Sequence, residues 1–204
     1  MDSFLIDTHI HTNLSPCASI TLEETLNGLI DRVDAIIVTD HDLVQNIPKN
    51  FLDSIKSKYE INILQPALEI STAQGHILGY GISSAPSFYL DAKEVIEIIH
   101  NEGGIAVAAH PFALLGLDEL IFSLEIDAIE INGSRSSRIN QMAKEAAEVI
   151  GLPLIGGSDS HTSYHVGTCV TKFQKEIKTM SDFIEEVKKG NCQPLFLTHR
   201  GSKD

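Results

Sequence analysis

The histidines and carboxylates of this chain follow short apolar segments, at the points where strands are expected to end. Residues 4–6 are apolar and lead into the segment DTHIHT, in which one residue separates His9 from His11. Side chains two positions apart in a strand point to the same side, so both imidazoles can face a single metal ion. An isolated His-x-His pair is more often an ordinary pair of surface or core histidines, so only its recurrence along the chain favours metal binding.

That recurrence is present, because several other candidates lie just past, or beside, an apolar strand-like run. These candidates are Asp40, His41, Glu69, His76, His110, Asp159 and His161. With His9 and His11 they offer more imidazoles and acids than the roughly four to six ligands of one ion. The set predicts two or three divalent ions, with Glu69 bridging two of them. We expect these ions to be zinc, manganese or iron in preference to magnesium.

Composition describes an ordinary globular chain. The chain has 204 residues, of which 43% are hydrophobic and 21% charged, and its formal net charge is −13. This length allows one domain, and we expect residues 1–204 to form it. The negative charge argues against an extended nucleic-acid surface. A small phosphorylated substrate remains compatible, because bound divalent ions reverse the local field.

The cysteines and the hydropathy pattern bear on the cellular setting. Cys17, Cys169 and Cys192 are too few and too irregularly spaced to predict a disulfide framework. The first residues lack the basic start and apolar core of a signal peptide, and no run approaches the ~18 apolar residues of a membrane span. We therefore expect a cytoplasmic protein with no membrane partner. The sequence leaves the oligomeric state open.

Strand-like and helix-like segments alternate along the chain. The predicted strands cover residues 4–9, 35–39, 61–70 (irregular at Pro66), 76–81, 105–109, 128–131, 154–155, 166–173 and 193–198. The predicted helices cover residues 21–32, 48–59, 91–101, 117–124, 136–150 and 181–189. This alternation predicts an α/β fold with a parallel sheet covered by helices. A closed barrel is favoured over an open sheet, because candidate ligands from nearly every strand would then meet at one mouth.

The order of the short motifs resembles that of the PHP (polymerase and histidinol phosphatase) family. The motifs are DTHIHT, VTDHD, ALEIS followed by a nearby histidine, AAHPF and GGSDSHT, and they span nearly the whole chain. The resemblance implies a distorted (β/α)7 TIM-like barrel with a metal site at the C-terminal ends of the strands. It also implies metal-dependent phosphoesterase activity.

The resemblance further implies how the ligands divide among the ions. His9, His11, Glu69 and Asp159 would bind one metal, Glu69, His76 and His110 a second, and His41 and His161 a third. The chain departs from the family at the third site, where Cys17 falls about where a histidine or aspartate is usual. A thiolate there would favour zinc or iron, whereas a small buried cysteine with a weak third site is equally compatible. Asp40 is expected to orient a neighbouring imidazole rather than bind metal.

Phosphate recognition needs cations near the metals. Arg135 and Arg138 follow the strand that ends in EING, and arginine suits bidentate phosphate contact. The alternative, a solvated charge at a helix N-terminus, applies more to Arg138 than to Arg135. His161 and His165 are the candidate general acids, and His199 is a weaker candidate.

Three functions are compatible with these residues. The leading hypothesis is a phosphoesterase that hydrolyses a small phosphate ester (a nucleotide, a short oligonucleotide, or histidinol or sugar phosphate) with a metal-activated water. The second is an amidohydrolase-type C–N hydrolase, although such sites usually contain a carboxylated lysine and no lysine ends a strand here. The third is a non-catalytic metal-binding domain of a larger assembly. The segments Ser83 to Leu90 and Ala113 to Leu120 are the candidate specificity elements.

Overall fold

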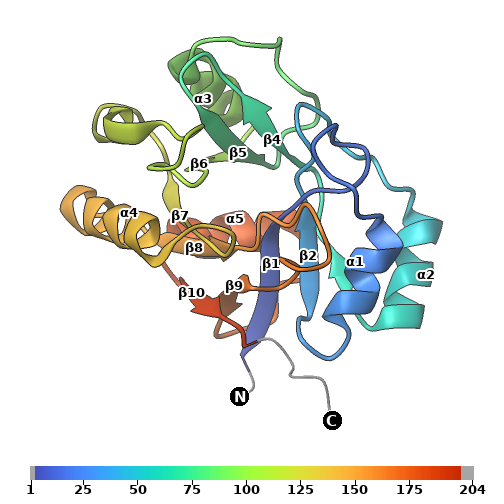
Figure 1. Cartoon of the computed structure of the whole chain (residues 1–204). Coiled ribbons are helices and arrows are strands. Elements are labelled where there is room, and N and C mark those ends of the chain that lie inside the picture. The colour runs from blue at the N-terminus through green and yellow to red at the C-terminus, as the bar shows by residue number, and fades with distance from the viewer. Residues whose placement is uncertain (1–2, 199–204) are drawn as a thin grey trace.

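The computed structural model describes residues 3–198, which form an α/β fold (Figure 1). The strands are β1 (Phe4–Ile10), β2 (Ala35–Val38), β3 (Asn62–Ile63), β4 (Ala67–Ser71), β5 (His76–Tyr80), β6 (Ile105–Ala108), β7 (Ala128–Asn132), β8 (Leu154–Gly157), β9 (Cys169–Phe173) and β10 (Cys192–Phe196). The helices are α1 (Leu22–Leu29), α2 (Lys49–Tyr59), α3 (Ala92–Asn101), the 3₁₀ helix η1 (Asp118–Phe122), α4 (Ser137–Ile150) and α5 (Met180–Lys188). None of the helices in the described part of the chain has the length and hydropathy that a membrane crossing requires.

The strands form two mixed sheets of five strands each, and not the predicted closed barrel. One sheet has the order β10-β9-β1-β2-β3, and the other has the order β4-β5-β6-β7-β8. The pairs β1–β2, β2–β3, β6–β7 and β7–β8 are parallel, whereas β4–β5, β5–β6, β1–β9 and β9–β10 are antiparallel. The α/β class is therefore confirmed. The prediction of a parallel sheet was wrong in part, because half of these strand pairs run antiparallel.

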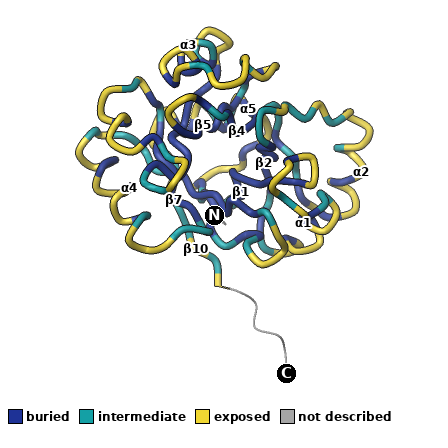
Figure 2. Tube along the Cα trace, turned by 45° about the horizontal axis from the view of Figure 1, so that its top comes forward, coloured by how far each residue is buried: buried dark blue, intermediate teal, exposed yellow. Residues whose placement is uncertain are grey.

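The two sheets meet at two places, here called seams, each marked by an isolated β-bridge. An isolated parallel bridge joins Ile10 of β1 to Ser160, just after β8, and another joins His41, after β2, to Glu69 of β4. Around the first seam the His11 amide donates to the Ser160 carbonyl at 3.1 Å, and the Asp159 amide donates to the His9 carbonyl at 2.8 Å. Residues of both sheets thereby meet at one end of the strands. Figure 2 shows the buried strands inside a ring of more exposed helices.

Most helices begin and end where the sequence predicts. Thr21 caps α1 in a capping box with Glu24, and Ser136 caps α4, which ends at Gly151 in a left-handed conformation. The single strand predicted for 61–70 is instead divided into β3 and β4 on either side of Pro66. Proline lacks the amide hydrogen that a continuous ladder needs, which accounts for the break. The helix predicted for 117–124 is the shorter η1.

Candidate metal centre

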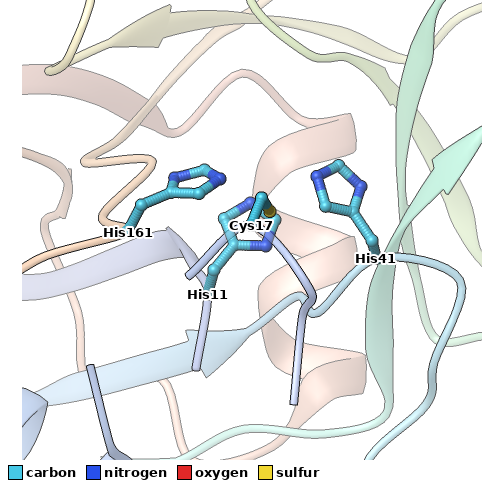
Figure 3. A group of neighbouring side chains, drawn as sticks. All are labelled: His11, Cys17, His41 and His161. Atoms are coloured by element: carbon cyan, nitrogen blue, oxygen red, sulfur yellow. The ribbon is translucent and has the colours of Figure 1, made fainter. Parts of the chain in front are cut away.

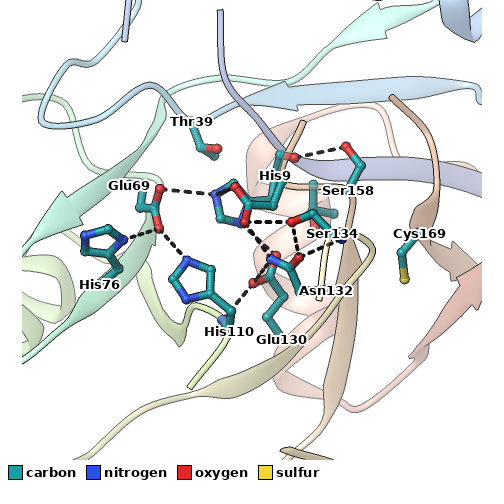
Figure 4. Close-up of polar contacts among 12 residues, drawn as sticks. His9, Thr39, Glu69, His76, His110, Glu130, Asn132, Ser134, Ser158 and Cys169 are labelled. Carbon is teal, nitrogen blue, oxygen red and sulfur yellow. Dashed lines mark hydrogen bonds and ion pairs between the residues drawn. The ribbon is translucent and has the colours of Figure 1, made fainter. Parts of the chain in front are cut away.

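Side chains from both sheets converge beside the two seams (Figure 4). His9 lies on β1 and His11 follows it, whereas Glu69 lies on β4 and His76 begins β5. His110 and Asp159 follow β6 and β8, and both adopt a positive φ (29° and 51°). Such backbone conformations are uncommon for residues with a Cβ and cluster at functional sites.

Four of these side chains surround one point. The Nε2 atoms of His9 and His11 are 3.0 Å apart, and they lie 3.2 and 3.0 Å from Glu69 Oε2. Asp159 Oδ1 lies 3.6 Å from His9 Nε2 and 3.5 Å from His11 Nε2. Donors that bind one ion at about 2.0–2.2 Å are separated by roughly 3–4 Å. These spacings are those expected of ligands to a shared ion.

Glu130 fixes the tautomer of His9. Its Oε1 lies 2.7 Å from His9 Nδ1, and its Oε2 accepts from the His110 amide at 2.8 Å and from Asn132 Nδ2 at 2.9 Å. Glu130 is fully buried on β7, inside the segment AIEIN. Because its carboxylate is an acceptor, His9 Nδ1 carries a hydrogen, and the lone pair of neutral His9 is on Nε2. The sequence analysis missed Glu130.

Ser15 fixes the tautomer of His11. The Ser15 hydroxyl donates to Asp40 Oδ1 at 2.7 Å and accepts from the His41 amide at 3.0 Å. Its remaining lone pair faces His11 Nδ1 at 3.2 Å, so that nitrogen donates and the Nε2 lone pair faces the cluster. Asp40 also accepts from the Thr12 amide at 2.7 Å and from the Thr12 hydroxyl at 2.8 Å. Asp40 therefore orients an imidazole only indirectly, through the Ser15 hydroxyl.

These tautomers test whether a metal fits the site. With both Nδ1 atoms donating, the Nε2 lone pairs of His9 and His11 face each other at 3.0 Å, with carboxylate oxygens beside them. Two lone pairs at that distance would repel, so the position between them favours a cation: a proton on His9 when no metal is bound, or a metal ion that replaces this proton. Asp159 Oδ1 is buried without a hydrogen-bond partner among the described residues. The donor set therefore fits a divalent cation.

The second carboxylate oxygen of Glu69 faces other imidazoles. Oε1 lies 2.8 Å from His76 Nδ1 and 3.1 Å from His110 Nε2. His41 Nε2 lies 3.4 Å from Glu69 Oε2, and the ligand atoms of His41, Glu69 and His76 all lie within 4.8 Å of one another. Glu69 thus contacts imidazoles with both oxygens, as a bridging carboxylate would.

A third group contains the cysteine that departs from the family pattern. The ligand atoms of His11, Cys17, His41 and His161 lie within 4.8 Å of one another (Figure 3). Cys17 is exposed. Partial desolvation of its thiol, together with the nearby carboxylates of Glu69 and Asp159, nevertheless raises the pKa of Cys17. A bound cation would act in the opposite direction and favour the thiolate.

The other oxygen of Asp159 is held by three donors. Oδ2 accepts from Arg135 Nη2 at 2.8 Å, from the Ser134 hydroxyl at 3.1 Å and from Asn132 Nδ2 at 3.2 Å. Asn132 also donates to Glu130, so one side-chain amide links the carboxylate that orients His9 to the carboxylate of Asp159. Such hydrogen bonds restrict the rotamers of the prospective ligands.

Electrostatics favour bound positive charge at this cluster. Burial alone would raise the pKa values of Glu69 and Asp159, but the neighbouring imidazoles, led by that of His9, hold both well below their usual range. Burial opposes a charge on His9, yet Glu130, Glu69 and Asp159 raise its pKa well above the ordinary value. Burial lowers the pKa of His41 to about 4. His41 is therefore neutral at pH 7 and can bind a metal without losing a proton.

A cavity of ≈ 210 Å³ opens beside the cluster. Its walls contain Cys17, His41, His76, His110, Ala113, Leu114, Leu115, Arg135, Asp159 and His161. Arg138, predicted to bind substrate, is exposed in the first turn of α4 and is not part of these walls. His165 is not part of them either, and His199 lies outside the described residues.

Comparisons with known proteins agree with this architecture. A family model described as PHP-associated matches residues 138–192. A two-domain protein from Bacteroides vulgatus, containing a predicted PHP-like metal-dependent phosphoesterase, superimposes with a TM-score of 0.72 at 18% identity. The match covers 96% of this chain and 65% of that one. The fold is PHP-like. The resemblance predicted from the motifs is thus confirmed.

Other proteins with similar folds differ in what they act on. The lesion-specific endonuclease PfuEndoQ from Pyrococcus furiosus matches with a TM-score of 0.64 at 16% identity, over 92% of this chain and 56% of its own. An amidohydrolase from Chromobacterium violaceum matches with a TM-score of 0.62 at 18% identity, over 76% of this chain and 87% of its own. An uncharacterized protein of Methanocaldococcus jannaschii is 26% identical over 67% of this chain and 87% of its own. The PHP-like fold therefore leaves the substrate open.

Proposed function

We propose that this protein is a metal-dependent phosphoesterase that hydrolyses a small phosphate ester. The observation that carries the proposal is the convergence of ligand atoms on one point: the Nε2 atoms of His9 and His11 are 3.0 Å apart, and Glu69 Oε2 lies 3.2 and 3.0 Å from them. Glu130 and Ser15 impose the tautomers of these two histidines through buried hydrogen bonds.

Two or three divalent ions are proposed, with ligands divided as the motifs imply. His9, His11, Glu69 and Asp159 would hold one, Glu69, His76 and His110 a second, and His41, His161 and Cys17 a third. Zinc, manganese or iron is favoured. When bound, such ions supply Lewis acidity and lower the pKa of water.

Arg135 is suited to bind the phosphoryl group. Its Nη2 donates to Asp159 at 2.8 Å, its side chain is 35% exposed, and it belongs to the cavity walls. Asp159 therefore holds the guanidinium in one orientation, while its other donors remain available to phosphate oxygens. Its Nε is buried without a partner among the described residues.

The proposed general acids are supported unequally by their positions. Burial lowers the pKa of His161, with the nearby His11 imidazole acting in the same direction. A neutral imidazole cannot donate a proton to a leaving alkoxide, so a ligand role for His161 is favoured over an acid role. His165 would need to move to reach a substrate, because it lies outside the cavity walls.

A small ester fits the surroundings better than a long nucleic acid. The cavity of ≈ 210 Å³ is below the roughly 300 Å³ at which ordinary ligand pockets begin, and the chain carries a net charge of −13. We further propose that the two sheets act as a single, open barrel-like domain. Its mouth would hold the ions.

The test is hydrolysis by protein stripped of metal and reloaded with Mn²⁺, Zn²⁺ or Fe²⁺. The panel contains p-nitrophenyl phosphate, nucleotides, sugar phosphates, an abasic DNA duplex and p-nitroacetanilide. We expect metal-dependent phosphate release from small esters, at least about 100-fold slower in Asp159→Asn and unchanged in the exposed control Asp53→Asn. Release of p-nitroaniline alone would support the amidohydrolase alternative, and no turnover with any metal would overturn the proposal.

A further inference from the structure

A second cavity adjoins the one beside the metal centre. It has a volume of ≈ 220 Å³, and it shares His76, Leu114 and Leu115 with the first cavity. Phe88 and Tyr89 also line it. Each cavity alone is below the roughly 300 Å³ lower end of small-molecule sites, whereas the two together fall within that range. A ligand that spans both would therefore be of ordinary size.

Large apolar side chains are unusually exposed around this second cavity. Leu114 is 98% exposed, Phe88 67%, Tyr89 60% and Leu115 56%. Single exposed apolar residues are common, but a group of four at the edge of a polar centre marks a binding surface. These residues belong to the two segments, Ser83 to Leu90 and Ala113 to Leu120, that the sequence analysis identified as specificity elements.

The backbone holds these apolar side chains in place. The His76 amide donates to the Leu115 carbonyl at 2.9 Å, and the Gly116 amide donates to the Ala113 carbonyl at 2.9 Å. A Cβ on Gly116 would lie 2.0 Å from the Pro111 carbonyl oxygen, so this turn requires glycine. The exposure of Leu114 therefore follows from a hydrogen-bonded turn.

The aromatic side of the cavity is anchored in a similar way. The Tyr89 amide donates to the Ser71 carbonyl at 3.3 Å, and the Ala73 amide donates to the Leu90 carbonyl at 2.9 Å. Tyr89 has a φ of 59°, and its ring packs edge-on against that of Phe88 with centroids 4.5 Å apart. The two rings present a preformed aromatic surface to the cavity that the leucines also line.

The polar side chains lining this cavity are largely occupied by the protein itself. The Thr72 hydroxyl donates to the Gly75 carbonyl at 2.6 Å and accepts from the Gly75 amide at 3.1 Å. Gln74 donates to Asp91 at 2.7 Å and accepts from the Ala92 amide at 2.8 Å. Among the described residues, the walls also contain no Asp, Glu, Lys or Arg. The cavity thus selects for a flat apolar group, and against a chain of hydroxyls or a second phosphate.

We propose that this second cavity binds an aromatic ring in the organic part of the substrate. The inference rests on the proposed phosphoesterase function, since it takes the phosphoryl group to lie in the first cavity. The substrate class is then a phosphate ester that carries an aryl group or a nucleobase. Sugar phosphates without a base would leave Phe88, Tyr89 and Leu114 without a partner.

The test measures binding, so that it does not depend on turnover. Affinities of the metal-loaded protein for benzylphosphonate and methylphosphonate, which resist hydrolysis, are compared by calorimetry. We expect benzylphosphonate to bind about three- to tenfold more tightly, and Phe88→Ala or Leu114→Ala to bring that ratio towards one. The exposed residues Phe122 and Val149 lie outside both cavities and provide controls, Phe122→Ala and Val149→Ala, that should keep the ratio.

The outcomes separate this inference from the proposed function. An equal affinity for the two phosphonates, or a preference that survives Phe88→Ala and Leu114→Ala, would overturn the aromatic site. A preference lost in those two variants, together with no hydrolysis of any ester, would support the site and refute the phosphoesterase. Comparing hydrolysis of adenosine monophosphate, ribose 5-phosphate and benzyl phosphate then distinguishes a nucleobase from a simple aryl group.

Discussion

Replacing Glu130 with glutamine tests the geometry of the candidate metal centre most directly. Oε2 of Glu130 accepts from the His110 amide at 2.8 Å and from Asn132 Nδ2 at 2.9 Å. Glutamine can keep these two bonds only with its oxygen on that side. Its NH₂ group then faces His9 Nδ1, which must become an acceptor, and the hydrogen of neutral His9 moves to Nε2. In this orientation Nε2 cannot bind metal.

The opposite orientation of the glutamine affects stability instead. Its oxygen would accept from His9, but its NH₂ would face the two donors of His110 and Asn132. Leaving buried donors unpaired costs about 1–3 kcal/mol each. In a chain of 204 residues, each kcal/mol lowers the Tm by about 2–4 °C. Glu130→Gln is therefore expected to weaken metal binding, lower the metal-free Tm, or do both.

The expected loss of affinity is about 10–100-fold, the usual effect of removing a group that orients a metal-binding imidazole, and corresponds to about 1.4–2.8 kcal/mol. Zn²⁺ affinity is measured by competition with a chromophoric chelator, and the Tm is measured in excess chelator. Glu186→Gln is the matched control, because Glu186 on α5 is also buried but pairs with Lys175, at 3.0 Å, instead of with a histidine. Wild-type affinity combined with a wild-type Tm in Glu130→Gln would refute the tautomer argument.

Three further predictions concern the ions and the residues around them. Metal at about 1,000 times its Kd should stabilise the fold by about 4 kcal/mol and raise the Tm by roughly 8–16 °C. The rise should be smaller in acid, where protons compete with the metal for the imidazoles. Differential scanning fluorimetry across pH measures this rise, and a rise that is absent or independent of pH would contradict the prediction. Cys17→Ser should reduce zinc affinity more than manganese affinity, because a thiolate prefers the softer ion; equal losses for both metals, by the same competition assay, would speak against a thiolate ligand. Arg135→Lys should lower kcat/KM for a phosphate ester by at least about tenfold, because lysine lacks the fork that contacts both Asp159 and phosphate, whereas the exposed Arg138→Lys should leave it unchanged; equal steady-state effects of the two changes would contradict the role of Arg135.

The sequence predicted which ligands converge better than it predicted how the strands pair. His9 and His11 could be placed on one side of a strand from their spacing alone, and the structure brings them within 3.0 Å. Strand pairing was harder, because a strand, a helix and a strand usually form a parallel unit. Here β5 and β6 are joined through α3 and yet pair antiparallel. The relative direction of two paired strands is decided by tertiary packing, and the hydrophobic pattern within each strand carries no information about it.

Glu130 illustrates why part of the candidate site escaped the sequence. It lies between two isoleucines in the predicted strand 128–131, whose other residues are apolar, and that strand was predicted from its hydrophobicity. An acid inside a buried strand is itself a signal, because buried carboxylates are almost always paired. The sequence could not identify its partner, since His9 is 121 residues away.

The order of the strands has a consequence for how the protein matures. Strands β4 to β8 form one sheet from a continuous stretch of chain, whereas β1 must wait for β9 to complete the other. During synthesis, His9 and His11 emerge long before Asp159 and His161 exist. We therefore expect the nascent chain to hold its ions weakly until its last third has left the ribosome, so that cofactor loading follows translation instead of guiding it.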